Sequence, residues 1–162
     1  CKLNDDFAPI AEKMKEAAAI VLGAPCYYDF VNAKTHALIE RSAYSFHHNS
    51  VYVLGGKPCI TVSTRWVRDK KNMEGDATKD YMQWAFAFAN RMESIGHVTA
   101  HGYGCCYLCG FGHNCGAGNA MTEKSQRIGG FEEEDLPPDF PVQTDTLDQI
   151  DDIVKLLKGK IT

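Results

Sequence analysis

The amino-acid sequence predicts an α/β domain built on an open parallel sheet with helices on both faces. Short, wholly apolar runs alternate along the chain with segments of helical periodicity, which is typical of that class. Two runs, at 19–22 and 59–63, are apolar enough to be strands buried on both sides, and a third strand is expected at 97–103. The length of 162 residues suits one domain spanning residues 1–162.

The first element is a helix, expected to run from about residue 7 to Ala18. Asp5 or Asp6 can cap its start, and Pro9 suits its first turn, where a missing amide leaves no bond unmade. Its apolar face is expected to carry three side chains, those of Phe7, Ile10 and Met14.

The strand at 19–22 comes next, and Pro25 should end it, because proline lacks the amide that a central strand needs for pairing. Aromatic side chains crowd the loop that follows, those of Tyr27, Tyr28 and Phe30. A helix is then expected, with an apolar side formed by Val31, Leu38 and Ile39. Ligands of open parallel sheets bind outside the carboxyl ends of strands, so this loop lies where such a fold has its site.

A strand at 59–63 and a basic loop ending near Asp76 precede a long helix, expected to reach about Ile95 and to end at Gly96. Its aromatic face is expected in the core and consists of Tyr81, Trp84 and Phe88. Near the end of the chain a last helix should carry an apolar stripe of Leu147, Ile150, Ile153, Val154 and Leu157.

The strand at 19–22 is expected to be central, yet only two strand candidates follow it. A central parallel strand needs a neighbour at each edge, since unpaired amides form an edge that proteins avoid exposing. We therefore expect the sheet to lack its first strands in this chain. A strand and a helix from before Cys1, or from a partner chain, should complete it.

Composition narrows the class of protein. The formal charge is −4 with no basic block, which argues against a nucleic-acid partner. No apolar run approaches the roughly 20 residues of a membrane-spanning helix, and no signal-peptide pattern opens the sequence. We expect a cytoplasmic protein with no membrane partner.

Four of the seven cysteines lie in an insertion expected at about 104–118: Cys105, Cys106, Cys109 and Cys115. Thiolates this close suit a tetrahedral zinc site or a cubane iron–sulfur cluster (4Fe–4S). Adjacent cysteines rarely both bind one metal, so three of them with His113 is another arrangement. Buried free thiols, or a redox disulfide between Cys106 and Cys109, are the alternatives.

Several short motifs occur in one order over residues 1–65: Cys1, Asp5-Asp6-Phe7, the strand at 19–22, Ala24-Pro25-Cys26-Tyr27, Ala37-Leu38-Ile39-Glu40-Arg41-Ser42 and Gly56-Lys57-Pro58. In this order they resemble the flavodoxin-like NAD(P)H-dependent FMN reductases, and more closely the archaeal and bacterial iron-sulfur flavoproteins. Residues 66–162 match only in the order of elements. The resemblance implies a flavodoxin-like three-layer fold whose first strand and phosphate-binding loop precede Cys1. Cys1 resembles the last ligand of a four-cysteine cluster motif; the alternative is an ordinary terminal thiol.

The resemblance implies an FMN site at the ends of two strands. The loop holding the flavin ring corresponds to Pro25, Cys26, Tyr27, Tyr28, Asp29 and Phe30. The pyrimidine side of the ring would be flanked by Ser63, Thr64, Arg65 and Trp66. The alternative is an aromatic cluster that fills the core. Three positions depart from the family pattern: Cys26 replaces an aliphatic residue, Asp29 a glycine and His36 a lysine.

The implied function is FMN-dependent electron transfer or an NAD(P)H:flavin or quinone-type oxidoreductase, coupled or not to an iron–sulfur cluster. The implied electron donor is ferredoxin or NAD(P)H, and the implied assembly a homodimer or homotetramer. Neither electron route requires a side-chain acid or base, so no catalytic residue is expected. The rival is a non-enzymatic flavodoxin-like subunit of a redox complex, with a structural zinc or relay cluster at Cys105–Cys115.

Overall fold

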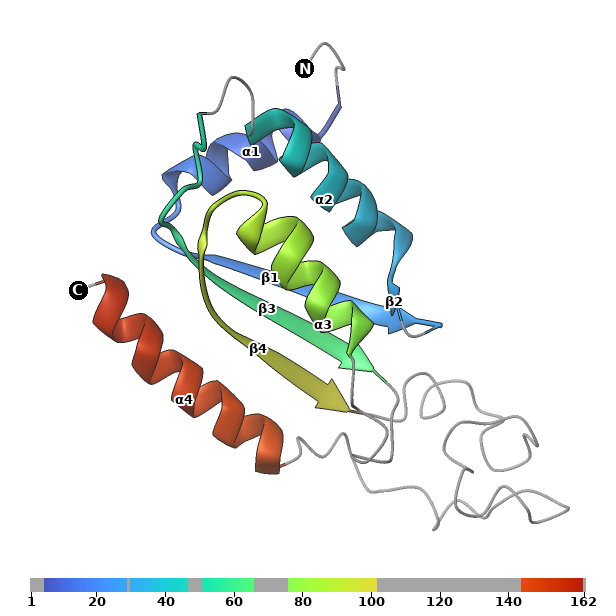
Figure 1. Ribbon diagram of the computed structural model, residues 1–162, viewed down its shortest axis with the longest axis vertical. Helices are drawn as coiled ribbons and strands as arrows, with labels where there is room; N and C mark the ends of the chain where they lie inside the picture. Colours follow the sequence, from blue (N-terminus) through green and yellow to red (C-terminus); the bar gives the residue numbers. More distant parts are fainter. Residues whose placement is uncertain (1–4, 29, 47–50, 66–75, 102–143, 162) are drawn as a thin grey trace, which may run out of the picture.

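A computed structural model describes residues 5–28, 30–46, 51–65, 76–101 and 144–161, which form a sheet with helices on both faces (Figure 1). One face is covered by α1 (Phe7–Glu16), α2 (Ala33–Phe46), α3 (Ala77–Tyr81) and η3 (Met82–Phe88). On the opposite face lies α4 (Thr144–Ile161). This arrangement confirms the α/β class with helices on both faces.

The sheet has the strand order β2-β1-β3-β4 among the described residues. The strands are β1 (Ile20–Tyr27), β2 (Phe30–Val31), β3 (Pro58–Arg65) and β4 (Glu93–His101). Both β1 with β3 and β3 with β4 are parallel, as expected. The short β2 folds back on the end of β1 as an antiparallel partner, pairing Tyr27 with Phe30.

β1 is longer than expected, and the prediction that Pro25 ends it is wrong. The strand continues to Tyr27, with Pro25 opposite Thr64 of β3. Along 20–25 the described residues place no strand on the other edge of β1, so the missing proline amide need not interrupt a second ladder there. The further strand expected at that edge stays a prediction.

The face that carries α1 and α2 is packed much as the sequence pattern indicates. Phe7 and Ile39 are buried as expected, but Ile10 is exposed and Ala11 takes the inward position in α1. The Asp5 carboxylate accepts a hydrogen bond of 3.1 Å from the Phe7 amide at the helix start. Cys59, at the beginning of β3, is fully buried, and burial raises the pKa of its thiol to about 12.

The prediction of one long helix that reaches Ile95 is wrong. α3 passes into the π-helix η3, which ends at Phe88, and β4 already begins at Glu93. Wider i to i+5 turns shift the inward face, so Met82, Ala85, Phe86 and Ala87 are buried. Trp84 and Phe88, expected in the core, are exposed instead.

α4 packs over β3 and β4 with only part of its expected stripe. Ile153 is buried against Ile60 and Val98, and Leu157 is partly buried beside them. Leu147, Ile150 and Val154 remain exposed in the described structure. Among the described residues, no helix is both long and apolar enough to cross a membrane.

Candidate functional site at the carboxyl edge of the sheet

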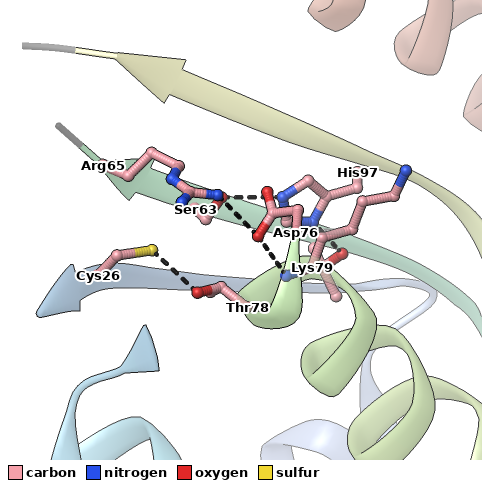
Figure 2. Close-up of polar contacts among 8 residues, drawn as sticks. Cys26, Ser63, Arg65, Asp76, Thr78, Lys79 and His97 are labelled. Carbon is pink, nitrogen blue, oxygen red and sulfur yellow. Dashed lines mark hydrogen bonds and ion pairs between the residues drawn. The ribbon is translucent and has the colours of Figure 1, made fainter. Parts of the chain in front are cut away.

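The carboxyl ends of β1, β3 and β4 meet at one edge of the sheet, because the three strands run parallel. The start of α3 lies over this edge, so its first residues face the ends of β1 and β3 (Figure 2). In an open α/β sheet this edge is where ligands bind.

The aromatic loop after β1 projects from this edge. Tyr27 is largely exposed, and Tyr28 is fully exposed with a left-handed backbone, φ 52°. Tyr27 and Tyr28 therefore do not fill the core in the described structure, which contradicts the core-filling alternative for both. Phe30 is 37% exposed, and its ring lies 4.8 Å from that of Tyr81, centroid to centroid.

A buried polar layer lies between β3 and β4 on the α3 side of the sheet. His97 of β4 bridges two buried hydroxyls of β3: its Nδ1 lies 2.7 Å from Thr61 Oγ1 and its Nε2 lies 2.9 Å from Ser63 Oγ (Figure 2). Burial lowers the pKa of His97 to about 4, against a smaller opposing effect of the Asp76 carboxylate. His97 is therefore neutral at pH 7, with one ring nitrogen donating and the other accepting.

A buried ion pair ties the end of β3 to the start of α3. Arg65 Nη1 lies 2.9 Å from Asp76 Oδ1, and the two side chains are only 10% and 7% exposed. The same oxygen accepts a 3.0 Å hydrogen bond from the Lys79 amide, so Asp76 also caps α3. The ion pair fixes the side chain of Arg65, a predicted site residue, at the end of β3 (Figure 2).

Cys26, which replaces an aliphatic residue of the family pattern, faces α3. Its thiol donates a long hydrogen bond of 3.5 Å to Thr78 Oγ1, so the polar Cys26 side chain has a polar neighbour (Figure 2). This contact connects the end of β1 to the same helix start that holds Arg65.

A second polar group lies beside the aromatic loop, between α3 and α2. Tyr81 Oη lies 2.7 Å from His36 Nδ1, and His36 Nε2 lies 3.4 Å from the Glu40 carboxylate one helical turn further along α2. The Tyr81 and His36 rings stack with 5.4 Å between centroids. Burial and, to a smaller extent, the Glu40 charge raise the pKa of Tyr81.

The structure brings together those predicted cofactor residues that it describes. They lie at the ends of β1 and β3 and in β2: Pro25, Cys26, Tyr27, Tyr28, Phe30, Ser63, Thr64 and Arg65. Asp29 and Trp66 lie outside the described residues. So do all five predicted metal ligands, Cys1, Cys105, Cys106, Cys109 and Cys115. In the described ranges, no group of three or more histidine, cysteine or acidic side chains could hold a metal ion.

Sequence reasoning missed the partners of these residues. Neither His97 nor Asp76 was a candidate site residue. The sequence does contain a signal for a polar layer: Thr61 and Ser63 alternate with the apolar residues Ile60 and Val62 in β3. That alternation indicates a polar layer on one face of the strand. The His36–Glu40 spacing is likewise an i, i+4 pair, but its contact with Tyr81 depends on tertiary packing.

Comparisons with known proteins place these features in a family. Part of the chain is 45% identical over 42 residues to an iron-sulfur flavoprotein of Methanocaldococcus jannaschii, a match covering 26% of this chain and 22% of that protein. The chain therefore spans about a fifth of that relative's length.

Two solved structures are among those similar to the chain. One is the Trp repressor binding protein from Bacillus subtilis, with 14% identity, a TM-score of 0.52, and coverage of 78% of this chain and 73% of that one. The other is an NADPH-quinone reductase from P. pentosaceus, with 15% identity, a TM-score of 0.48, and coverage of 97% and 75%.

The first of these supports a flavodoxin-like fold and no more than the fold. The family model described as NADPH-dependent FMN reductase matches residues 1–100, which include the aromatic loop, the buried polar layer and most of β4. With that match over more than half of its length, the chain belongs to the NADPH-dependent FMN reductase family.

Proposed function

We propose that the protein is a flavin-dependent oxidoreductase that binds FMN with the ring at the carboxyl ends of β1 and β3 and takes reducing equivalents from NAD(P)H. Family membership supports FMN and this reaction class. The observation that carries the placement is the exposure of Tyr27 and Tyr28 at the carboxyl end of β1, inside the region that the family model matches.

The described residues fit the ring end of such a cofactor. An isoalloxazine needs a flat apolar wall and backbone groups at its polar edge. Tyr27 and Tyr28 offer exposed rings at the carboxyl end of β1. Pro25 lies opposite Thr64 in neighbouring strands, so the ends of β1 and β3 can flank the ring from two sides.

A bound FMN supplies the redox chemistry itself, accepting hydride and passing on electrons singly or in pairs. The chain's own residues hold the edge at which it binds. Neutral His97 joins β3 to β4 through two hydroxyls, and the Arg65–Asp76 pair fixes the end of β3 against α3. A preorganised edge lowers the entropy lost when a ligand is ordered there.

Coupling to an iron–sulfur cluster is a second candidate, favoured by the 45% identity to an iron-sulfur flavoprotein over 42 residues. We propose its ligands at one of two separate places: Cys1, as the last ligand of a four-cysteine motif, or the cysteines of 105–115. The donor that we propose is ferredoxin, and the assembly is a homodimer or homotetramer. Iron and acid-labile sulfide in anaerobically purified protein would support this candidate. Finding zinc, or finding neither iron nor zinc, would contradict this candidate and leave the flavin reaction without a cluster.

The test of the flavin site is a titration of the purified protein with FMN, followed by quenching of flavin fluorescence. Replacing Tyr27 or Tyr28 with alanine should raise the Kd for FMN by about two- to tenfold, since an aromatic contact of this kind contributes about 0.5–1.5 kcal/mol. Tyr44→Ala, which removes an exposed tyrosine from α2, should leave the Kd unchanged. Failure of the wild-type protein to bind FMN or to oxidise NAD(P)H would overturn the proposal and favour a non-enzymatic subunit.

A further inference from the structure

Arg65 and Asp76 place two opposite charges in a buried position at the carboxyl edge of the sheet. Arg65 is the last residue of β3, and Asp76 precedes the first turn of α3. Their side chains are only 10% and 7% exposed, and Arg65 Nη1 lies 2.9 Å from Asp76 Oδ1 (Figure 2). Because water screens buried charges weakly, these two act over longer distances than surface charges do.

Contacts with two strands bring this ion pair to the proposed ring site. Arg65 ends β3, which is paired with β1 as far as Thr64. Thr78, two positions after Asp76, contacts the thiol of Cys26 near the end of β1 (Figure 2). The ion pair therefore lies beside the ends of both strands, where the ring of FMN is proposed to bind.

Stability alone does not account for the two charges. A buried ion pair is often no more stable than a well-packed apolar pair, because removing two charges from water offsets their attraction. Capping α3 does not need a charge either, since asparagine caps a helix about as well as aspartate. Asp76 Oδ2 accepts no hydrogen bond from the described residues, so the contacts described for this carboxylate go through Oδ1.

The charges at this edge act on a side chain beyond their own ion pair. Burial is the main cause that lowers the pKa of His97 to about 4. Among the charges, Asp76 raises this pKa, while Lys79 and Arg65 lower it, and Asp80 has the smallest effect and raises it. Arg65 and Asp76 thus oppose each other at a neighbouring titratable group. A ring bound at the same edge would experience the same two opposing fields.

Hydride transfer makes bound FMN sensitive to such fields. A hydride carries two electrons and one proton, so the ring gains one negative charge when NAD(P)H is oxidised to NAD(P)⁺. A cation near the ring therefore favours the reduced form and raises the reduction potential, and an anion does the opposite.

We propose that the Arg65–Asp76 ion pair sets the reduction potential of bound FMN: Arg65 favours the reduced ring, and Asp76 cancels most of that effect. This inference rests on the proposed flavin-dependent function and names two residues that control its driving force. Both act through the fields of their charges, so they are positioning residues and not catalytic ones. Asp76 keeps reduced FMN a strong enough reductant to pass its electrons on.

The test is the reduction potential of bound FMN, measured by anaerobic titration against a reference dye at neutral pH. Asp76→Asn keeps the size of the side chain and an oxygen that can accept from Arg65 and from the Lys79 amide, so chiefly the charge changes. The variant should bind reduced FMN about tenfold more tightly relative to oxidised FMN. This ratio corresponds to a potential raised by about 30 mV for two electrons. Asp80→Asn, which removes an exposed carboxylate from the same helix, is the matched control and should shift the potential only slightly.

Removal of the other charge should have the opposite effect. Arg65→Gln should lower the potential, because the charge of Asp76 is then uncompensated. If that variant does not fold because a buried carboxylate is left unpaired, the double variant Arg65→Gln/Asp76→Asn takes its place. The double variant should return the potential from the raised value of Asp76→Asn to near that of the wild type. A merely structural role predicts no such cancellation. An unchanged potential in Asp76→Asn, or a double variant that stays at the raised value, would overturn the inference.

The outcomes separate this inference from the function on which it rests. A wild-type protein that binds no FMN contradicts the proposed function, and the control of its potential with it. Wild-type and Asp76→Asn proteins that both bind FMN and oxidise NAD(P)H, with the same ratio of Kd for oxidised and reduced FMN, support the function. That result contradicts the role of the ion pair alone.

Discussion

Tyr28 is held in a costly conformation at the rim of the proposed flavin site. Its φ of 52° lies in the left-handed region, which costs a residue with a Cβ about 1 kcal/mol or more. Its side chain is fully exposed, so the described structure shows no packing that offsets this cost. Strain without compensating burial is typical of residues whose side chain serves a ligand, and it agrees with the role that we propose for Tyr28.

His97 makes stability depend on pH. Its pKa falls from 6.5 in the unfolded chain to about 4 in the folded protein, so the unfolded state binds more protons between these values. The stability contribution is complete above pH 6.5 and is lost as pH falls toward 4. The full shift corresponds to about 3 kcal/mol, which partial exposure to solvent reduces to roughly 1–2 kcal/mol.

Urea unfolding at pH 7.5, 5.5 and 4.5 measures this dependence. His97→Gln, which can still reach a hydroxyl on one side, should be less stable at pH 7.5 but should lose less stability on acidification than the wild type. Asp76, Arg65, Lys79 and Asp80 act on His97 in both directions and are unchanged in the variant. Equal acid sensitivity in the two proteins would show that other groups control it.

At the scale of elements, the sequence pattern was sufficient for the strands and for three of the helices. β1 and β3 appear at the apolar runs that indicate them, and β4 overlaps its predicted range but begins earlier, at Glu93. The expectation that β1 is buried on both faces is not met in the described structure, where its buried and exposed residues alternate. The helix from 77 onward was mispredicted because η3 widens its turns, and a 3.6-residue period then assigns Trp84 and Phe88 to the wrong side. Propensity carries no signal for this change, which depends on packing against α2 and β4.

Gly96 shows why β4 begins earlier than expected. Instead of ending a helix, it lies inside β4 where α4 approaches, and a Cβ there would come within 2.9 Å of Ile153 Cδ1. Glycine at this position allows the close contact between strand and helix. The sequence shows a glycine after a helical pattern, and only the packing of α4 decides which role it has.

Gly96→Ala should therefore destabilise the protein by about 1 kcal/mol, because the Ile153 side chain must shift to make room. In an Ile153→Ala background the same substitution should cost close to nothing. A double-mutant cycle of urea midpoints measures the coupling, and Gly159→Ala, at a glycine with open space around it in α4, is the control. Equal costs of Gly96→Ala in the two backgrounds would contradict the contact.

At the scale of the whole molecule, the candidate site could be located from the sequence but not assembled. The rule that ligands bind at the carboxyl ends of parallel strands placed Tyr27 at one edge, and the family resemblance added Thr64 and Arg65. The structure puts all three at that edge. The end of β3 is held by His97, which contacts Ser63, and by Asp76, which pairs with Arg65. These partners lie 34 and 11 positions further along the chain. Contacts at that separation follow from the topology of the sheet, which periodicity alone does not give.

The two faces of the sheet are unequally covered in the described structure, and this carries the last prediction. α4 packs over β3 and β4, while Val21 of β1 is 62% exposed on that side of an otherwise apolar strand. A strand and helix beside β1, from this protein or from a partner chain, would cover Val21. Val21→Thr, which keeps shape and strand preference but adds a hydroxyl, should then cost about 1–2 kcal/mol of unfolding free energy. Val51→Thr, at a valine 60% exposed outside the sheet, should change it by less than about 0.5 kcal/mol. Equal, small effects of the two substitutions in urea unfolding would mean that β1 faces water on this side, and the predicted strand and helix would have to be abandoned.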